Sequence, residues 1–140
     1  MNKLLEKLNY RGSKRIAVLN ATESCISALA EEMNGLKIDR EIDPRFPYDF
    51  IVIFVKNQEE IETCIPEALH NLMCDGVLWF CFPRKSRTLN HSVIDREHGW
   101  QTLNKVGFQG IRVVTFDDEW TALRFRSVKF IKSAAEKSAR

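Results

Sequence analysis

The sequence lacks the short motifs that mark several common enzyme classes. It contains no G-x-x-x-x-G-K-[ST] phosphate-binding loop and no G-x-G-x-x-G dinucleotide-binding turn, which argues against ordinary NTPase and dehydrogenase roles. No serine or cysteine stands in a G-x-S-x-G setting, so hydrolase chemistry has no support. The histidines His70, His91 and His98 do not form an H-E-x-x-H or comparable zinc pattern.

Cysteine pairs with metal-binding spacing are also missing. The four cysteines, at positions 25, 64, 74 and 81, include no C-x-x-C pair. Each of them lies within an apolar or helical stretch of the sequence. We therefore expect buried, reduced thiols that pack as small apolar side chains, and no metal site.

Long apolar runs and a strong charge of either sign are absent as well. No stretch approaches the ~20 apolar residues of a membrane span, and the first residues form an amphipathic segment unlike a secretory signal. We expect a cytoplasmic protein without membrane contact. The net charge is +2 and the pI about 8.4, below the value of about 9 typical of dedicated nucleic-acid-binding domains. Bulk charge therefore neither requires nor excludes an anionic partner.

The sequence does contain enough apolar material for an independent core. It has 140 residues, of which 44% are hydrophobic and 29% are charged. A chain of this length buries about two thirds of its unfolded surface on folding, so it needs no metal or disulfide support. We expect a single domain over residues 1–132, followed by a polar tail over residues 133–140.

Short apolar runs alternate with helical stripes along the chain. The apolar runs predict strands over residues 15–20, 36–42, 49–55, 77–82, 111–116 and 121–127. Stripes at helical spacing predict helices over residues 2–9, 22–34, 57–72 and 93–106. Pro66 lies inside the third of these stripes, where we expect it to kink or split the helix.

Strand–helix alternation followed by a hairpin indicates one fold class. The link over residues 117–120 is so short that the two strands beside it must pair antiparallel. The sequence therefore predicts an α/β fold, a three-layer α/β/α Rossmann-like sandwich of about six strands, mostly parallel with one antiparallel strand from the C-terminal hairpin. The predicted strand order is second, first, third, fourth, sixth, fifth.

Five stretches of the sequence are informative together: Leu19-Asn-Ala21, Tyr48-Asp-Phe-Ile-Val-Ile-Phe-Val55, Gly76-Val-Leu-Trp79, Phe82-Pro-Arg-Lys-Ser86 and Asp118-Glu-Trp-Thr-Ala-Leu-Arg-Phe125. In these stretches the chain resembles a bacterial family of unknown function that has a truncated S-adenosylmethionine-dependent methyltransferase-like fold. In methyltransferases the last strand inserts antiparallel beside the strand that here is residues 77–82. The resemblance implies a fold and brings no reaction with it.

Two departures from the methyltransferase pattern argue against cofactor binding. The family follows its first strand with a glycine-rich turn, because the backbone must approach S-adenosylmethionine closely. Here residues 20–24 contain no glycine. The family also places a further helix and strand before the strand that is here residues 49–55, whereas only residues 43–48 occupy that interval.

A ligand site is expected at the carboxyl ends of the strands, where the strand order reverses. The residues that follow the first and third strands there are Asn20, Thr22, Glu23, Lys56 and Asn57. They are candidates for ligand binding. The alternative is that Thr22 and Asn57 only cap the helices that follow them.

A basic loop, Arg84-Lys-Ser-Arg87, follows the fourth strand at the same edge. Its cations Arg84, Lys85 and Arg87 and the hydroxyl of Ser86 suit a phosphate or a carboxylate, since charge-assisted hydrogen bonds are about twice as strong as neutral ones. We therefore predict an anion site in this loop; an ordinary solvated loop is the alternative.

The acidic run Asp117-Asp-Glu119 at the hairpin is suited either to holding a hard cation or simply to contact with water. Trp120 is expected to anchor the core rather than to hold a ligand. His91 and Asp95 are four residues apart, so they would meet on one helix face.

Three functions fit these features. The first is a non-catalytic, methyltransferase-like module that binds a small anionic ligand or a protein partner. The second is an S-adenosylmethionine-dependent methyltransferase with an atypical cofactor loop. The third is a nucleic-acid accessory protein that uses residues 84–87 and the basic termini.

Overall fold

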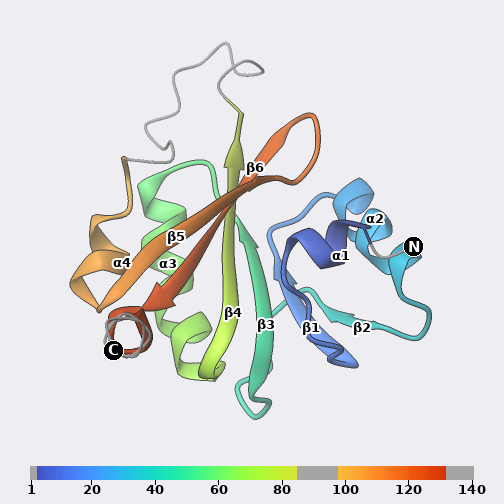
Figure 1. Cartoon of the computed structure of the whole chain (residues 1–140), viewed down its shortest axis with the longest axis horizontal. Coiled ribbons are helices and arrows are strands. Elements are labelled where there is room, and N and C mark those ends of the chain that lie inside the picture. Colours follow the sequence, from blue (N-terminus) through green and yellow to red (C-terminus); the bar gives the residue numbers. More distant parts are fainter. Residues whose placement is uncertain (1–2, 85–97, 132–140) are drawn as a thin grey trace, which may run out of the picture.

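The computed structural model describes residues 3–84 and 98–131, which form a six-stranded sheet of order β2-β1-β3-β4-β6-β5 (Figure 1). The strands are β1 (Arg15–Leu19), β2 (Lys37–Asp39), β3 (Tyr48–Phe54), β4 (Leu72–Pro83), β5 (Phe108–Thr115) and β6 (Trp120–Ser127). The first four are mutually parallel, and β6 pairs antiparallel with both β4 and β5. The predicted fold class and strand order are confirmed.

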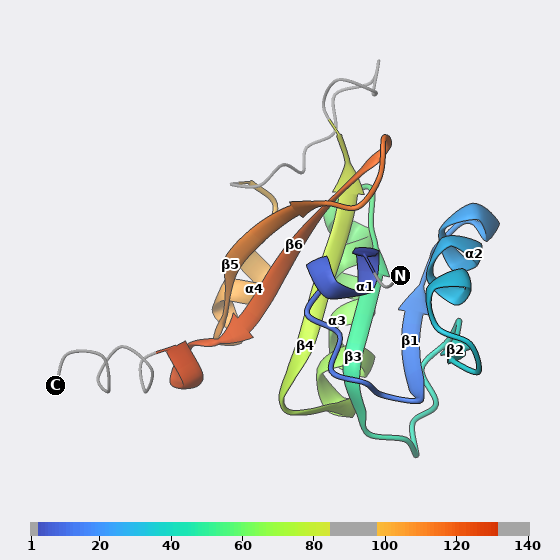
Figure 2. The same cartoon turned by 45° about the vertical axis from the view of Figure 1, so that its right-hand side comes forward.

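Helices cover both faces of the sheet. α1 (Lys3–Lys7) and α2 (Glu23–Glu32) pack on one face, and α3 (Gln58–Asn71) and α4 (Gln101–Lys105) pack on the other (Figure 1 and Figure 2). In the described part of the chain, no helix has the length and apolar character needed to cross a membrane.

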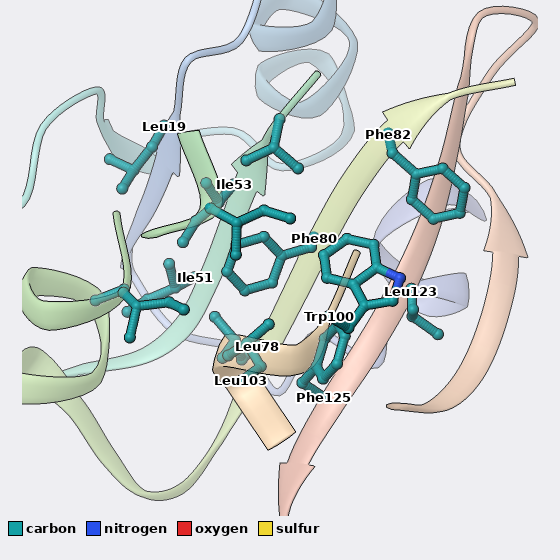
Figure 3. Close-up of a cluster of buried hydrophobic side chains, with 14 of the residues drawn as sticks. Leu19, Ile51, Ile53, Leu78, Phe80, Phe82, Trp100, Leu103, Leu123 and Phe125 are labelled. Atoms are coloured by element: carbon teal, nitrogen blue, oxygen red, sulfur yellow. The ribbon is translucent and has the colours of Figure 1, made fainter. Parts of the chain in front are cut away.

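The core on the α3 and α4 face is built from alternate residues of the central strands. Ile51, Ile53 and Phe80 are fully buried there, because β3 and β4 are covered on both faces. Figure 3 shows Trp100 beside Phe80 and Phe125; the ring centroids lie 5.6 Å and 5.0 Å apart, respectively. This aromatic cluster fixes the chain just before α4 against the sheet.

The opposite face of the sheet has its own core, made by the residues of the central strands whose side chains point to that face. Phe50, Val52 and Trp79 are fully buried there and pack with leucines of α1 and with Leu29 of α2. The two cores explain why residues 50–54 of β3 and 77–82 of β4 are wholly apolar in sequence.

Pro66 does not split the third helix, because α3 runs without a break from Gln58 to Asn71. A proline inside a helix costs about 3 kcal/mol. Ile61, Ile65 and Ala68 are buried on its sheet-facing side, and burying an aliphatic side chain contributes about 1.5–3 kcal/mol. The packing of this face therefore outweighs the missing backbone hydrogen bond.

Some element bounds differ from the sequence-based expectation. β2 is a three-residue edge strand rather than the predicted seven residues, since its pairing with β1 covers only Lys37–Asp39. β4 begins at Leu72 instead of Val77. The predicted helix over residues 93–106 is too long, since only Gln101–Lys105 of its described residues 98–106 form α4. Residues 85–97 and 132–140 lie outside the described residues.

The expectation that all four cysteines are buried is wrong for Cys74, which is exposed, and only partly right for Cys64, which is half-buried; Cys25 and Cys81 are buried. Cys74 lies where the pairing of β3 with β4 shifts register, between Tyr48↔Leu72 and Phe50↔Val77. The β4 residues between these two pairs have no partners on β3, so Cys74 lies in an irregular part of the strand and is exposed.

Candidate functional site

The carboxyl ends of β1 and β3 lie side by side, since Leu19 pairs with Ile53. From β1 the chain continues to β2 on one side, and from β3 it continues to β4 on the other side, so the strand order reverses between β1 and β3. Open α/β sheets bind ligands at such a point. Asn20 follows β1, and Lys56 and Asn57 follow β3. The structure thus brings these predicted candidates to one edge.

Asn20 joins the two strand ends. Its side-chain Nδ2 donates to the carbonyl oxygen of Phe54 at 3.2 Å and lies 3.5 Å from the Sγ of Cys64. Its backbone has a φ of 61°, in the left-handed region that glycine reaches most readily and that asparagine tolerates. Asparagine therefore supplies the turn that a glycine would supply, but adds a side chain that bridges the crevice between β1 and β3.

Thr22 and Asn57 cap the two helices that begin at this edge. The Oγ1 of Thr22 accepts a hydrogen bond from the backbone N–H of Cys25 at 3.3 Å, and the Oδ1 of Asn57 accepts one from Glu60 at 2.9 Å. The Oε1 of Glu60 in turn accepts from the backbone N–H of Lys56 at 2.6 Å. The capping interpretation of both residues is confirmed.

Glu23 is paired with Arg40, a residue that the sequence interpretation missed. Arg40 Nη1 lies 2.5 Å from Glu23 Oε1, and both side chains are largely exposed. Arg40 Nη2 also lies 3.5 Å from the carbonyl oxygen of Ala21. Arg40 directly follows β2, and the ends of parallel strands meet at one edge, so its position in the sequence was a usable signal.

A hollow of about 440 Å³ lies beside Asn20, lined by Leu19, Asn20, Arg40, Glu41, Ile42, Thr63, Cys64 and Glu67. Its volume is within the range of small-molecule sites. The carboxylates of Glu41 and Glu67 border it, and the guanidinium of Arg40 is already paired with Glu23. The charge around this hollow therefore does not favour an anion.

Arg84 is the described member of the predicted anion loop; Lys85, Ser86 and Arg87 lie outside the described residues. The backbone N–H of Arg84 donates to the carbonyl oxygen of Glu119 at 3.0 Å, and its Nη1 lies 3.5 Å from the carbonyl oxygen of Asp117. The end of β4 is thereby tied to the β5–β6 turn.

The acidic run at that turn has a structural role. Asp117 Oδ1 accepts hydrogen bonds from the backbone N–H groups of Glu119 at 2.8 Å and Trp120 at 2.9 Å. Trp120 is buried, and its ring centroid lies 4.9 Å from that of Phe54, so the expected core anchor is confirmed. Within residues 3–84 and 98–131, no three His, Cys, Asp or Glu side chains gather as they would around a metal ion.

The acidic side chain at the end of β2 is also engaged within the protein. In nucleotide-binding sheets an acid near this position often holds a ribose hydroxyl. Asp39 Oδ2 lies 2.7 Å from the Nη2 of Arg15 and accepts a hydrogen bond from the Tyr48 hydroxyl, and its side chain is only 11% exposed. Together with the Asn20 bridge, this arrangement does not fit S-adenosylmethionine.

Comparison with solved structures places the fold among methyltransferases. A methyltransferase dependent on S-adenosylmethionine from Aquifex aeolicus matches with a TM-score of 0.56 and 15% identity, over 88% of this chain and 87% of that one. A ribosomal protein L11 methylase from Lactobacillus delbrueckii subsp. bulgaricus matches with a TM-score of 0.54 and 13% identity, over 89% and 76%.

A third match is a larger enzyme, phosphoethanolamine N-methyltransferase 2 from Haemonchus contortus, in complex with phosphomonomethylethanolamine and S-adenosylhomocysteine. The TM-score is 0.53 at 15% identity, over 89% of this chain but only 38% of that one. No family model matches the sequence. No curated protein matches it either. At these identities the likeness shows a methyltransferase-like, Rossmann-like fold, and the chemistry of this chain must be argued from its own residues.

Proposed function

We propose that this chain is a methyltransferase-like module that acts by binding a partner and does not itself transfer a methyl group. The observation that carries this proposal is the Asn20 bridge, in which Nδ2 donates to the Phe54 carbonyl oxygen at 3.2 Å. The side chain lies across the strand ends where a dinucleotide or S-adenosyl cofactor needs close approach to bare backbone.

The surroundings of Asn20 support the same proposal. Asp39 is held by Arg15 and Tyr48, and the free donors at the start of α2 are partly satisfied by Thr22. The groups that would contact a cofactor are therefore bonded within the protein, and releasing them would cost part of the binding energy.

The alternative is a methyltransferase with an atypical cofactor loop. The left-handed φ of 61° at Asn20 favours it, because this is the backbone conformation that a glycine in a cofactor turn provides. One of the matching structures, the Haemonchus contortus enzyme, is in complex with S-adenosylhomocysteine.

Cofactor titration separates the two functions. The thermal unfolding midpoint is measured with and without millimolar S-adenosylmethionine and S-adenosylhomocysteine, because a ligand at 100 times its dissociation constant adds about 2.7 kcal/mol to stability. We expect no shift for the native protein. A clear shift that saturates with cofactor would overturn the proposal.

The variant Asn20→Gly tests the bridge itself. Glycine keeps the left-handed backbone and removes the side chain, so the crevice opens without strain. Cofactor binding by the variant alone would identify the bridge as the barrier. The control is Asn57→Asp, which leaves the crevice unchanged and keeps a capping oxygen at the start of α3.

A further inference from the structure

Four arginines gather far from the carboxyl edge of the sheet. Arg124 and Arg126 lie on β6, Arg112 lies on β5, and Arg11 lies in the loop after α1. Arg112 pairs with Arg124 across β5 and β6, and Asp75 joins Arg126 to Arg11, because its carboxylate is bonded to Arg126 and its carbonyl oxygen to Arg11. We call these four residues the arginine cluster.

The arginine cluster lies on the sheet face that α1 and α2 cover only in part. Along β6, Trp120 and Ala122 pack into the core on that face, and the alternation of a strand places Arg124 and Arg126 on the same side. Figure 2 shows the β5–β6 hairpin diverging from α1 and α2 toward its lower end. Arg112 and Arg11 are exposed, and the other two are half-buried.

The arrangement is unfavourable for the isolated protein. Arg112 and Arg124 face each other directly across the β5–β6 pairing, and like charges in that position destabilise a sheet. Burial and the neighbouring guanidinium groups lower the pKa of Arg124. The pairing therefore lowers stability, as residues at functional sites often do.

The carboxylate of Asp75 offsets only part of this charge. Both of its oxygens are bonded at 2.8 Å to Arg126, through Nε and Nη2. Arg11 Nη1 donates to the carbonyl oxygen of Asp75 at 3.1 Å, so it uses no carboxylate oxygen. Four guanidinium groups and one carboxylate give a formal charge of +3, which exceeds the +2 of the whole chain.

One donor of Arg124 has no acceptor. Its Nε is buried and has no hydrogen-bond partner among the described residues. A buried donor without a partner destabilises the folded protein, so this position adds to the cost of the cluster. This orphaned donor lies at the centre of the cluster, next to the cross-strand neighbour Arg112.

We propose that the arginine cluster binds the phosphodiester backbone of a nucleic acid. All four cations are arginine in a chain whose 21 cationic residues are divided almost equally between lysine and arginine, and the planar guanidinium suits phosphate oxygens. The donors come from three segments spread over an open sheet face, which fits an extended chain of phosphates better than a small ligand that needs a concave pocket.

This inference names a partner for the binding function proposed above, but it does not depend on the absence of a cofactor site. Cofactor binding would overturn the proposed function and leave the arginine cluster unaffected. Conversely, a failure to bind nucleic acid would overturn this inference and leave the argument from Asn20 unchanged.

The test is fluorescence anisotropy with labelled single-stranded and duplex oligonucleotides across a range of salt concentrations. Each phosphate contact contributes about −0.7 to −0.9 to the slope of log K against log salt, so the charge of +3 on the cluster predicts a slope of roughly −2 to −3. Arg112→Gln should weaken binding about tenfold, because a hydrogen bond to a charged group is lost, and should reduce the slope by about 1. The double variant with Arg124→Gln should lower both further.

Arg45→Gln is the matched control. Arg45 is exposed in the loop between β2 and β3, outside the β5–β6 hairpin, and its replacement makes the same charge change. It should leave binding unchanged. Arg112→Gln should not lower the unfolding midpoint, because it removes a like-charge pair; this keeps the test valid even if Arg124→Gln fails to fold.

Three outcomes would overturn the inference. The first is no binding at low salt. The second is equal weakening by Arg45→Gln and Arg112→Gln, which would indicate a general charge effect. The third is displacement of the oligonucleotide by tripolyphosphate or polyglutamate at the same concentration of charge, which would indicate a small anion or an acidic peptide as the ligand.

Discussion

The indole Nε1 of Trp79 donates a hydrogen bond to the backbone carbonyl oxygen of Leu8 at 2.7 Å, and both groups are buried. Leu8 directly follows α1, and at the other end of that helix the carboxylate of Glu32 accepts from the backbone N–H groups of Leu4 at 3.1 Å and Leu5 at 2.8 Å. A helix of five residues is not stable alone. Contacts from β4 and α2 therefore hold α1 in place.

We predict that Trp79→Phe destabilises the protein by about 2–3 kcal/mol, because it leaves the buried Leu8 carbonyl without a donor and reduces the packed volume. The free energy of unfolding is measured by urea denaturation. Hydrogen exchange gives the control: amides of residues 4–10 should exchange faster in the variant, whereas those of α3 should change little. Uniform acceleration would contradict the anchoring role of this bond.

The capping role of Asn57 gives a second prediction. Asn57→Ala should lower the free energy of unfolding by about 1 kcal/mol, since the backbone N–H of Glu60 loses its acceptor. Asn57→Asp should keep most of the stability, because a carboxylate oxygen caps equally well and favours a helix N-terminus. Equal losses in the two variants, measured by thermal and urea unfolding, would argue against a cap.

The order of the elements could be predicted from the sequence because residues 50–54 of β3 and 77–82 of β4 are unbroken apolar runs. Ile51 and Val52 face opposite cores, and a strand covered on both sides cannot contain polar residues at either position. The antiparallel direction of β6 followed from the brevity of the turn at Asp117. Local sequence patterns of this kind are therefore enough to predict the strand order and strand directions.

The side-chain relationships of the site were not predictable in the same way. The pairing of Glu23 with Arg40 and the bridge from Asn20 to the Phe54 carbonyl join residues 17 and 34 positions apart. Such contacts depend on side-chain rotamers and on strand register, and hydrophobic periodicity does not predict either of them. The arginine cluster could not be predicted from the sequence for the same reason, since Arg11 and Arg124 come near each other only when β4 and β6 are paired.

Alkaline pH gives a third prediction. Burial raises the pKa of the Tyr48 hydroxyl, and its hydrogen bond to Asp39 raises it further; burial also raises the pKa of Tyr10. A proton held more tightly in the folded state stabilises the protein at neutral pH, and this contribution is lost as pH rises above the unfolded value of about 10. We therefore expect the free energy of unfolding to fall with increasing pH in that range.

The variant Tyr48→Phe isolates this contribution. It should make the fall in stability above about pH 10 less steep, because one of the two tyrosines no longer titrates. At pH 8 it should be less stable than the native protein, since Asp39 loses a donor and the backbone N–H of Asp43 loses its acceptor at 3.0 Å. Urea denaturation at pH 8 and about pH 10.5 measures both effects; an unchanged slope would contradict the assignment.

Thiol reactivity gives the last prediction. Cys74 is exposed, whereas Cys25 and Cys81 are buried, and burial raises the pKa of both buried thiols. The reactive species is the thiolate, so burial slows alkylation both by excluding the reagent and by disfavouring ionisation. We expect iodoacetamide to modify Cys74 first in the native protein and half-buried Cys64 more slowly, with Cys25 and Cys81 modified only on unfolding. Peptide mass spectrometry over a time course measures this order, with protein in urea as the control; early modification of Cys81 would show that the centre of the sheet opens far more readily than its packing implies.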